Sequence, residues 1–321
     1  MCDARCNSAL NRSVYFPATM RVPADQTFVQ MNAGGQSRPG PASRTPGTLG
    51  RYQILHELGK GAMGVVYRAR DPMINRDVAL KSIPLADEFE GADLEDARAK
   101  FFREAEMAGR LSHPHIVTIY DAGEDRGTAY IAMELLRGRH LVEYTHAEHL
   151  FPTALALEIV ARLADALNYA HQQHVVHRDI KPANVMYEPS RGDLKITDFG
   201  IARLTDSNRT RTGIVLGTPS FMSPEQLQGR AVTGSSDLFS LAITLYQLLT
   251  GVLPFRADSM PALMLKIVQE PHPRIRMVRP DLPAGLDEFF ARALAKDPAG
   301  RIESGAAFAQ ALRDVAPRAM D

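Results

Sequence analysis

The chain has 321 residues, 45% of them apolar, which is enough to bury the core of one large domain or of two lobes. Its 37 Lys and Arg residues balance its 37 Asp and Glu residues, so no overall charge indicates nucleic acid or an anionic membrane as a partner. The two cysteines, Cys2 and Cys6, are too few for a disulfide scaffold and fit a reducing compartment.

Neither a membrane span nor a secretory signal is apparent in the sequence. The longest apolar run, 241–255, is shorter than the roughly 18 residues that a span requires, and we expect a buried helix there. The N-terminus has no continuous apolar segment, which predicts a cytoplasmic protein without a membrane span. Residues 32–50 are rich in Gly, Pro and Ser, so residues 1–50 are expected to form a disordered leader.

From residue 51 the pattern is typical of a twisted antiparallel sheet. Short apolar runs separated by Gly, Asp and Pro predict strands over 52–58, 64–70, 77–83, 116–123 and 128–135. One helix is expected among them, over 94–111, because this stretch is acidic at its start and basic toward its end. The acidic stretch 84–96 is expected to be a solvated loop.

After residue 135 the pattern becomes helical. Over 153–173 a single stripe contains Val160, Leu163, Ala164 and Leu167. Residues 235–251 are apolar on nearly all sides, begin with Ser and Asp suitable for capping, and end at Gly251. We therefore expect an α+β, bilobal fold, with a small β-rich lobe over 51–134, a larger α-helical lobe over 135–318, and the active cleft between them.

A glycine-rich segment joins the first two expected strands. Gly59, Gly61 and Gly64 form the pattern GxGxxGxV, in which backbone N–H groups can approach phosphate oxygens closely. The same pattern occurs at dinucleotide sites and in ordinary tight turns. A dinucleotide fold needs a helix directly after the last glycine, and here Val65 and Val66 continue a strand instead.

Lys81 ends an apolar strand run and is a candidate phosphate-binding residue. The ordinary alternative is a strand lysine whose charged end reaches water. Glu104 in the following helix favours the phosphate-binding role, because a buried ammonium needs a carboxylate to hold it in position. Glu106 is a rival partner, but it lies two residues further on and therefore on another face of the helix.

The segment 177–200, HRDIKPANVMYEPSRGDLKITDFG, contains the groups that phosphoryl transfer requires. Asp179 is the candidate base for a substrate hydroxyl, and Lys181 can neutralise the transferring phosphoryl group. Asn184 offers an amide oxygen to a divalent cation, and Asp198, after a hairpin, offers a carboxylate that bridges the cation to the phosphates. Such hard oxygen ligands predict magnesium rather than zinc.

The glycine-rich loop, VALK, HRD with Asn184, DFG and SPE at 223–225 follow one another in an order that resembles the eukaryotic-type (Hanks-type) serine/threonine protein kinases, bacterial subgroup. The resemblance covers residues 51–315. It implies the bilobal protein-kinase fold, ATP and Mg²⁺ as cofactors, and transfer of the γ-phosphoryl group to Ser and Thr hydroxyls of protein substrates. It also suggests a homodimer in which two copies phosphorylate each other.

The same resemblance implies a nucleotide site. Met133 resembles the gatekeeper, Glu134 and Leu136 offer backbone groups to adenine, and Val66, Ala79 and Met186 enclose the base. The complete set of residues expected to hold ATP is Leu58, Gly59, Lys60, Gly61, Ala62, Met63, Gly64, Val65, Val66, Ala79, Lys81, Glu104, Met133, Glu134, Leu136 and Met186.

Residues 200–225 resemble an activation loop. Arg178 before Asp179 indicates activation by loop phosphorylation, for which Thr210 and Thr212 are preferred over Thr205 and Ser207. An ordinary polar loop is the alternative. Three further roles are implied by the resemblance: Thr218 would tie Asp179 to Lys181, Glu225 would pair with Arg301, and Asp237 would brace the catalytic loop.

Several positions depart from the family pattern. Ser223 replaces the usual Ala of APE, Gly234 and Ser235 replace a basic approach to Asp237, and Ala108 stands where a larger residue normally contacts Phe199. None of these changes removes a reacting group. A pseudokinase scaffold remains the alternative function, although it would be expected to lack Lys81, Asp179, Asn184 or Asp198.

Overall fold

The computed structural model describes residues 47–61, 64–199 and 219–316. Most of the expected leader lies outside these ranges, as do residues 200–218 of the expected activation loop. Where the leader and the described residues overlap, the structure differs from the prediction, because strand β1 (Thr48–Leu49) pairs with the next strand. Leu49 is buried with Tyr52 and Val78, and this apolar contact explains why the fold begins before residue 51.

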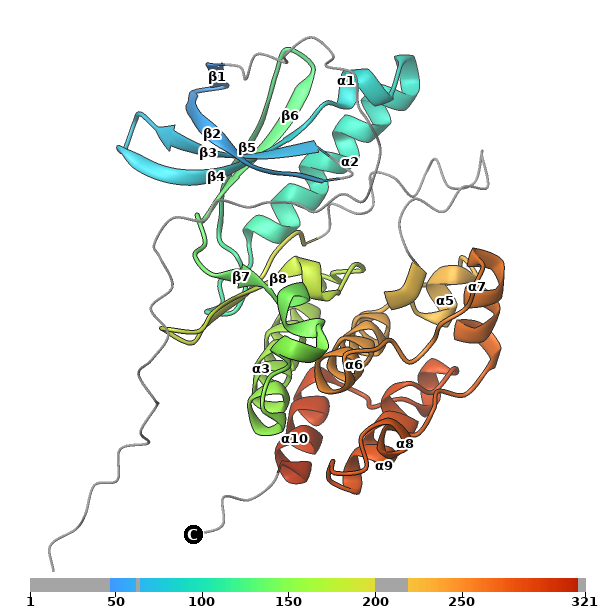
Figure 1. Ribbon diagram of the computed structural model, residues 1–321. Helices are drawn as coiled ribbons and strands as arrows, with labels where there is room; N and C mark the ends of the chain where they lie inside the picture. Colours follow the sequence, from blue (N-terminus) through green and yellow to red (C-terminus); the bar gives the residue numbers. More distant parts are fainter. Residues whose placement is uncertain (1–46, 62–63, 200–218, 317–321) are drawn as a thin grey trace, which may run out of the picture. The chain divides into compact units, whose positions relative to one another are not determined.

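The first half of the described chain forms one antiparallel sheet in the order β1-β2-β3-β4-β6-β5 (Figure 1). Its other strands are β2 (Tyr52–Gly61), β3 (Gly64–Asp71), β4 (Arg76–Ile83), β5 (Ile119–Asp125) and β6 (Thr128–Met133). Each predicted apolar run contributes a strand. β5 starts later than predicted because residues 116 and 117 contact β9 (Asp193–Ile196) instead, where Val117 N donates to Ile196 O at 2.9 Å.

The predicted helix is present as α2 (Gly91–Gly109) and packs against this sheet, where Phe101 and Ala105 are buried with Ile131. The acidic stretch before it is not the expected solvated loop. It contains a further helix, α1 (Leu85–Glu88), and Leu85 and Phe89 are buried in the same cluster. Burial of Leu85 and Phe89, four positions apart, thus stabilises a helix here although the residues around them are acidic.

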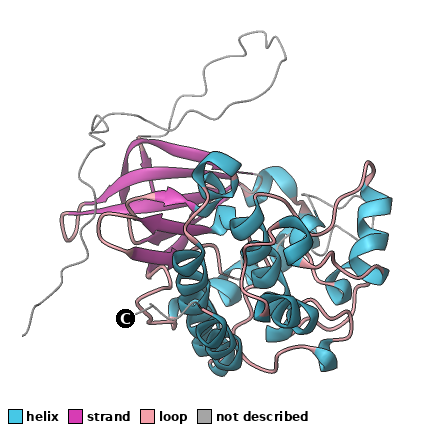
Figure 2. Ribbon diagram, turned by 60° about the horizontal axis from the view of Figure 1, so that its bottom comes forward, coloured by secondary structure: helices cyan, strands magenta, loops and turns pink. Residues whose placement is uncertain are grey.

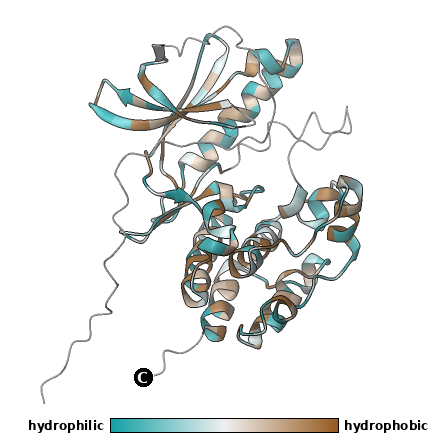
Figure 3. Ribbon diagram, in the orientation of Figure 1, coloured by the Kyte–Doolittle hydropathy of each residue, from teal (hydrophilic) through white to brown (hydrophobic). Residues whose placement is uncertain are grey.

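The rest of the described chain is mainly helical (Figure 2). The longer helices are α3 (Thr153–Gln172), α6 (Gly234–Thr250), α7 (Met260–Gln269), α9 (Gly285–Ala293) and α10 (Gly305–Val315), and the shorter ones are α5 (Pro224–Leu227) and α8 (Ile275–Val278). Figure 3 shows apolar residues concentrated along α6, which is buried on nearly all sides as predicted. None of the described helices has the length and apolarity to cross a membrane.

A small sheet and several single-turn helices complete this part. The sheet is ordered β7-β8-β9 and consists of β7 (Arg139–His140), β8 (Val185–Glu188) and β9. The 3-10 turns are η1 (Leu141–Thr145), η2 (Ala147–His149), η3 (Pro182–Asn184), η5 (Pro219–Phe221) and η6 (Pro298–Gly300). The hairpin of β8 and β9 turns where the sequence predicts.

Helix α6 ends where the sequence predicts, but its start differs from the prediction. Gly251 ends the helix in the left-handed conformation, with a φ of 76°, as expected. At the other end the expected Ser and Asp caps are wrong, because the cap is Thr233, without a side-chain bond. Ser236 and Asp237 lie in the first turn and bond to other segments, Ser236 Oγ to Glu225 and Asp237 to the catalytic loop.

Candidate active site

The predicted base Asp179 lies in the loop between α3 and β8, where two side chains converge on it. Lys181 Nζ donates to Asp179 Oδ2 at 2.7 Å, and Asn184 Nδ2 donates to the same oxygen at 2.9 Å. Asn184 Nδ2 also donates to the backbone O of Asp179 at 2.8 Å. The Asp179 side chain is 37% exposed, so this carboxyl group is partly accessible from solvent.

Asp237 at the start of α6 accepts hydrogen bonds from the backbone of this loop, as the resemblance implied. Its side chain is fully buried, with Oδ2 accepting from His177 N at 2.8 Å and Oδ1 accepting from Arg178 N at 2.7 Å. His171 Nε2 donates to Oδ2 at 2.8 Å. A buried carboxylate is tolerated here because each of its oxygens accepts hydrogen bonds.

His177 is also fully buried and links the catalytic loop to the DFG segment. Its Nδ1 accepts from Asp179 N at 3.2 Å, so its other nitrogen, Nε2, donates to Thr197 O at 2.7 Å. The Phe199 ring lies 4.5 Å from the His177 ring and shares a core with Ala108. An aromatic neighbour in the catalytic loop therefore covers Phe199 beside the small Ala108 side chain.

Lys81 does not form the expected pair with Glu104 in this structure. Its Nζ lies 2.6 Å from Asp198 Oδ1, whereas Glu104 Oε1 lies 3.8 Å from Arg178 Nη1. The choice of Glu104 over Glu106 as the inward residue agrees with the structure, because Glu104 is buried and Glu106 is exposed. Glu104 therefore faces Arg178 of the HRD motif, and Lys81 pairs with Asp198 after β9.

The charge on Asp198 is favoured by its partner. Burial by itself would raise the pKa of Asp198, but the charge and hydrogen bond of Lys81 outweigh it and hold that pKa below the ordinary value. The two predicted metal ligands lie at the same end of the β8–β9 hairpin, since Val185 pairs with Ile196 and Thr197 N donates to Asn184 O at 2.9 Å.

The donor set at this end of the hairpin fits magnesium. An amide oxygen from Asn184 and a carboxylate from Asp198 are hard ligands. Among the described residues no group of three or more His, Cys, Asp or Glu could hold a metal ion. A cation at this site would therefore take its remaining ligands from phosphate oxygens and water, which is the usual coordination of magnesium with nucleotides.

The glycine-rich hairpin of β2 and β3 has two kinds of glycine. A Cβ at Gly59 would meet no atom within 4 Å, so open space remains on that side for a ligand. A Cβ at Gly64, where φ is 137°, would lie 1.8 Å from Ser82 O, so this glycine allows β3 to approach β4. Ala62 and Met63 lie outside the described residues.

An apolar cluster where the sheet meets residues 134–136, here called the hinge, brings together five of the residues expected to hold ATP. Ala79, Val117 and Met133 are buried in it, and Leu58, Val66, Leu135 and Leu136 pack against them. Val117 and Leu135 were missing from the predicted set. The sequence around Val117 predicts only a strand, and Leu135 is flanked by the predicted site residues Glu134 and Leu136, so the contacts in the folded protein are needed to identify both.

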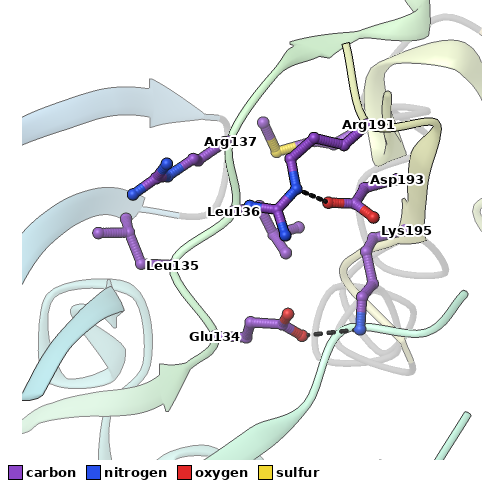
Figure 4. A pocket seen from close by; sticks show the side chains of 8 residues that line it. Glu134, Leu135, Leu136, Arg137, Arg191, Asp193 and Lys195 are labelled. Atoms are coloured by element: carbon purple, nitrogen blue, oxygen red, sulfur yellow. Dashed lines mark hydrogen bonds and ion pairs between the residues drawn. The ribbon is translucent and has the colours of Figure 1, made fainter. Parts of the chain in front are cut away.

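A pocket of about 330 Å³ opens where the hinge meets the β8–β9 hairpin (Figure 4). It is lined by Glu134, Leu135, Leu136, Arg137, Met186, Arg191, Asp193 and Lys195, three of which belong to the predicted nucleotide site. Lys195 Nζ donates to Glu134 Oε2 at 2.9 Å and to Ile116 O at 3.2 Å. This link between hinge and hairpin has no short motif in the sequence, because its residues are separated by 61 positions.

The expected pair of Glu225 and Arg301 is confirmed. Arg301 donates from Nη1 to Oε1 and from Nη2 to Oε2, each at 2.8 Å, and both side chains are buried. Burial opposes the charge of Glu225, but the hydrogen bonds from Arg301 and Ser236, together with the positive charge of Arg301, outweigh it and lower the pKa of Glu225. The expected loop residues Thr210, Thr212 and Thr218 lie outside the described residues.

Comparison with known proteins independently supports the resemblance to protein kinases. Residues 52–313 match the family model described as protein kinase domain. The chain is 40% identical over 256 residues to the serine/threonine-protein kinase PrkC of Bacillus subtilis, covering 79% of this chain and 39% of PrkC. It is 42% identical over 266 residues to PknJ of Mycobacterium tuberculosis, a serine/threonine-protein kinase, covering 81% of this chain and 44% of PknJ.

A solved structure is similar as well. The crystal structure of the Mycobacterium tuberculosis PknI kinase domain has a TM-score of 0.68 and 34% sequence identity, covering 84% of this chain and 98% of that one. The chain spans less than half the length of the curated relatives PrkC and PknJ.

Proposed function

Because this chain belongs to the protein kinase family, we propose that it transfers the γ-phosphoryl group of ATP to serine and threonine hydroxyls of protein substrates. The observation that carries the proposal is the convergence of Lys181 and Asn184 on one oxygen of Asp179, within 2.9 Å. This arrangement orients the carboxylate and leaves its other oxygen for the substrate.

Each reacting group has a task in an in-line displacement. The substrate hydroxyl oxygen bonds to the γ-phosphorus while the bond from that phosphorus to the β–γ bridging oxygen breaks, and ADP leaves with the electron pair. Asp179 accepts the hydroxyl proton, and Lys181 offsets negative charge on the phosphoryl group. Lys81 and the backbone of the glycine-rich hairpin position the remaining phosphates.

Asn184 and Asp198 would hold magnesium, which when bound neutralises phosphate charge. The apolar cluster around Ala79 and Met133 provides one side for adenine, with backbone groups of Glu134 and Leu136 as hydrogen-bond partners. Each of the four groups whose loss would indicate a pseudokinase is present, and no observation favours that alternative.

The proposal also covers loop phosphorylation, dimerisation and cellular location. We propose that Thr210 and Thr212 are phosphorylated, supported by Arg178, which is only partly exposed and lies beside Glu104. Trans-phosphorylation within a homodimer follows from the resemblance. A cytoplasmic location is supported by the scarcity of cysteine.

The test measures phosphate transfer from labelled ATP with Mg²⁺ to the chain itself and to a mixed protein substrate. Asp179→Asn and Lys81→Met are expected to lower the rate by roughly 100-fold or more. Asp314→Asn, a matched change at an exposed position on α10, is expected to leave it unchanged. ATP binding by the wild type without any phosphate transfer would falsify the enzyme proposal in favour of a nucleotide-binding scaffold.

Mass spectrometry of wild type and Asp179→Asn tests the phosphorylation sites. We expect phosphate on Thr210 and Thr212 only in the wild type. If active protein carries neither, the assignment of these two residues is wrong while the kinase proposal stands.

A further inference from the structure

Gln226, in the short helix α5 at the end of the expected activation loop, contacts the loop that carries Asp179. Its Nε2 donates to the backbone O of Arg178 at 2.8 Å, although 48 positions separate the two residues. Arg178 directly precedes Asp179. The bond therefore connects α5 to the peptide unit that leads into the candidate base.

Ser223 determines which way the Gln226 amide points. Ser223 N donates to Gln226 Oε1 at 2.9 Å, and Ser223 Oγ donates to the same atom at 3.1 Å. Gln226 N in turn donates to Ser223 Oγ at 3.4 Å, which completes a capping box. With both Ser223 donors on the amide oxygen, the amide nitrogen is left to face Arg178 O.

The hydroxyl of Ser223 is fully buried, so it is costly unless it is hydrogen-bonded. This is the position where the chain departs from the APE pattern of its family, in which alanine has no hydroxyl. Alanine at this position would keep the N–H donor to Gln226 Oε1 but would lack the hydroxyl donor, so the departure adds a second hydrogen bond that orients Gln226.

The bond from Gln226 completes a set of contacts around Arg178. Arg178 has a φ of 71°, a left-handed conformation that a long side chain adopts only when its surroundings hold it there. Asp237 Oδ1 accepts from its N–H at 2.7 Å, and Gln226 holds its carbonyl. In the same peptide unit as that carbonyl, the N–H of Asp179 donates to His177 Nδ1 at 3.2 Å.

The peptide that joins Arg178 to Asp179 is thus held at its C=O by Gln226 and at its N–H by His177. A rotation of this peptide would turn the Cα of Asp179 and move its carboxylate away from Lys181 and Asn184. The helix that carries Gln226 is itself anchored, because neighbouring Glu225 is paired with buried Arg301.

We propose that Gln226, oriented by Ser223, is a positioning residue that fixes the peptide before Asp179 and so couples α5 to the catalytic base. The inference rests on the proposed kinase function. It assigns Gln226 an effect on the phosphoryl-transfer step, through Asp179, without a contact to nucleotide or to the reacting atoms.

Gln226→Glu is the most direct test, because it keeps shape and the Ser223 acceptor but replaces the donor to Arg178 O with a carboxylate oxygen. We expect kcat to fall by about 10-fold or more, while KM for ATP and the melting temperature stay close to wild type. Gln228→Glu is the matched control, since it makes the same change at an exposed position two residues away and should leave kcat unchanged.

Ser223→Ala and Gln226→Met, alone and combined, test the orientation by Ser223. We expect the single changes to lower kcat and the double change to lower it by less than the product of the two effects. Hydrogen exchange of the Asp179 amide should increase in Gln226→Glu, because release of the peptide exposes its N–H.

The outcomes separate the inference from the function on which it rests. A wild type without phosphate transfer contradicts the proposed function itself. An active wild type whose Gln226→Glu variant keeps its kcat, or loses kcat only in proportion to a general loss of folding and ATP affinity, overturns the positioning role alone.

Discussion

Lys81 of β4 and Asp198, which follows β9, form an ion pair with 2.6 Å between Nζ and Oδ1. The pair joins the six-stranded sheet to the helical part of the chain, and the Lys81 side chain is only 11% exposed, so water screens it little. Asp198 has a φ of 62°, a conformation that costs an aspartate roughly 1 kcal/mol. Lys81 therefore holds this carboxylate against a local backbone preference.

Lys81→Met should destabilise the protein in a pH-dependent way. We expect the free energy of unfolding at pH 7 to fall by about 1–3 kcal/mol, because a partly buried carboxylate loses its partner. The folded state lowers the pKa of Asp198, so this stabilisation is present above the ordinary aspartate pKa and is lost as the pH falls through the folded value.

Denaturant unfolding of wild type and Lys81→Met across pH 3 to 7, a window set by the ordinary aspartate pKa of about 3.9, checks this. The difference between the two proteins should narrow at the acid end. Lys266→Met, at a side chain that is 40% exposed, is the control and should show a small, pH-independent effect. A difference that is constant with pH would contradict the assigned partner.

Gly234→Ala should lower activity without unfolding the protein. A Cβ at Gly234 would lie 2.5 Å from His171 Nδ1 and would push this ring away from Asp237. We expect kcat to fall severalfold, whereas alanine in a helix usually stabilises by about 1 kcal/mol relative to glycine. Steady-state kinetics and thermal melts measure the two effects separately. Gly109→Ala, where a Cβ meets no atom within 4 Å, should leave kcat unchanged, and equal kcat values in both variants would refute the role of His171.

Lys296 should make the protein more stable as the pH rises above 8. Its Nζ donates to Ile267 O at 2.6 Å and lies 3.9 Å from the Phe255 ring centroid. Burial, followed by the charge of Arg301, lowers the pKa of Lys296 to about 8. The unfolded chain, with a lysine pKa of about 10.4, binds more protons between these two values, so the free energy of unfolding increases with pH in that window.

The comparison of wild type with Lys296→Met at pH 7 and pH 9.5 measures this contribution. We expect wild type to gain at most about 1 kcal/mol relative to the variant between the two values, since part of the side chain is in water. Lys266→Met serves as the control again. A wild type that loses stability relative to Lys296→Met over this range would show that the lysine is not titrating as inferred.

Most secondary structure and the reacting groups of the site were predictable from the sequence because both depend on short stretches. Short apolar runs bounded by Gly, Asp and Pro predicted β3 and β4, and the 3.6-residue stripe predicted α3. Asp179, Lys181 and Asn184 lie within six consecutive residues, so the spacing of the motif already placed them in one loop.

Other features could not be predicted, because they depend on which distant segments meet. The acidic composition of residues 84–96 concealed α1, whose Leu85 and Phe89 are buried only once β6 and α2 are in place. Similarly, Lys195 can bond to Glu134 only when the β8–β9 hairpin lies beside the end of β6.

By itself, the sequence determined the chemistry of the site, since the identity and spacing of HRD, Asn184 and DFG are local and set which acid, amide and ammonium are available. The tertiary structure decided how these groups pair. Lys81 has carboxylates at Glu104, Glu106 and Asp198 as candidates, and only the packing of α2 and β9 turns Glu104 toward Arg178 and brings Asp198 within 2.6 Å. Ion pairs depend on distance and desolvation, and both arise only when separate parts of the chain come together.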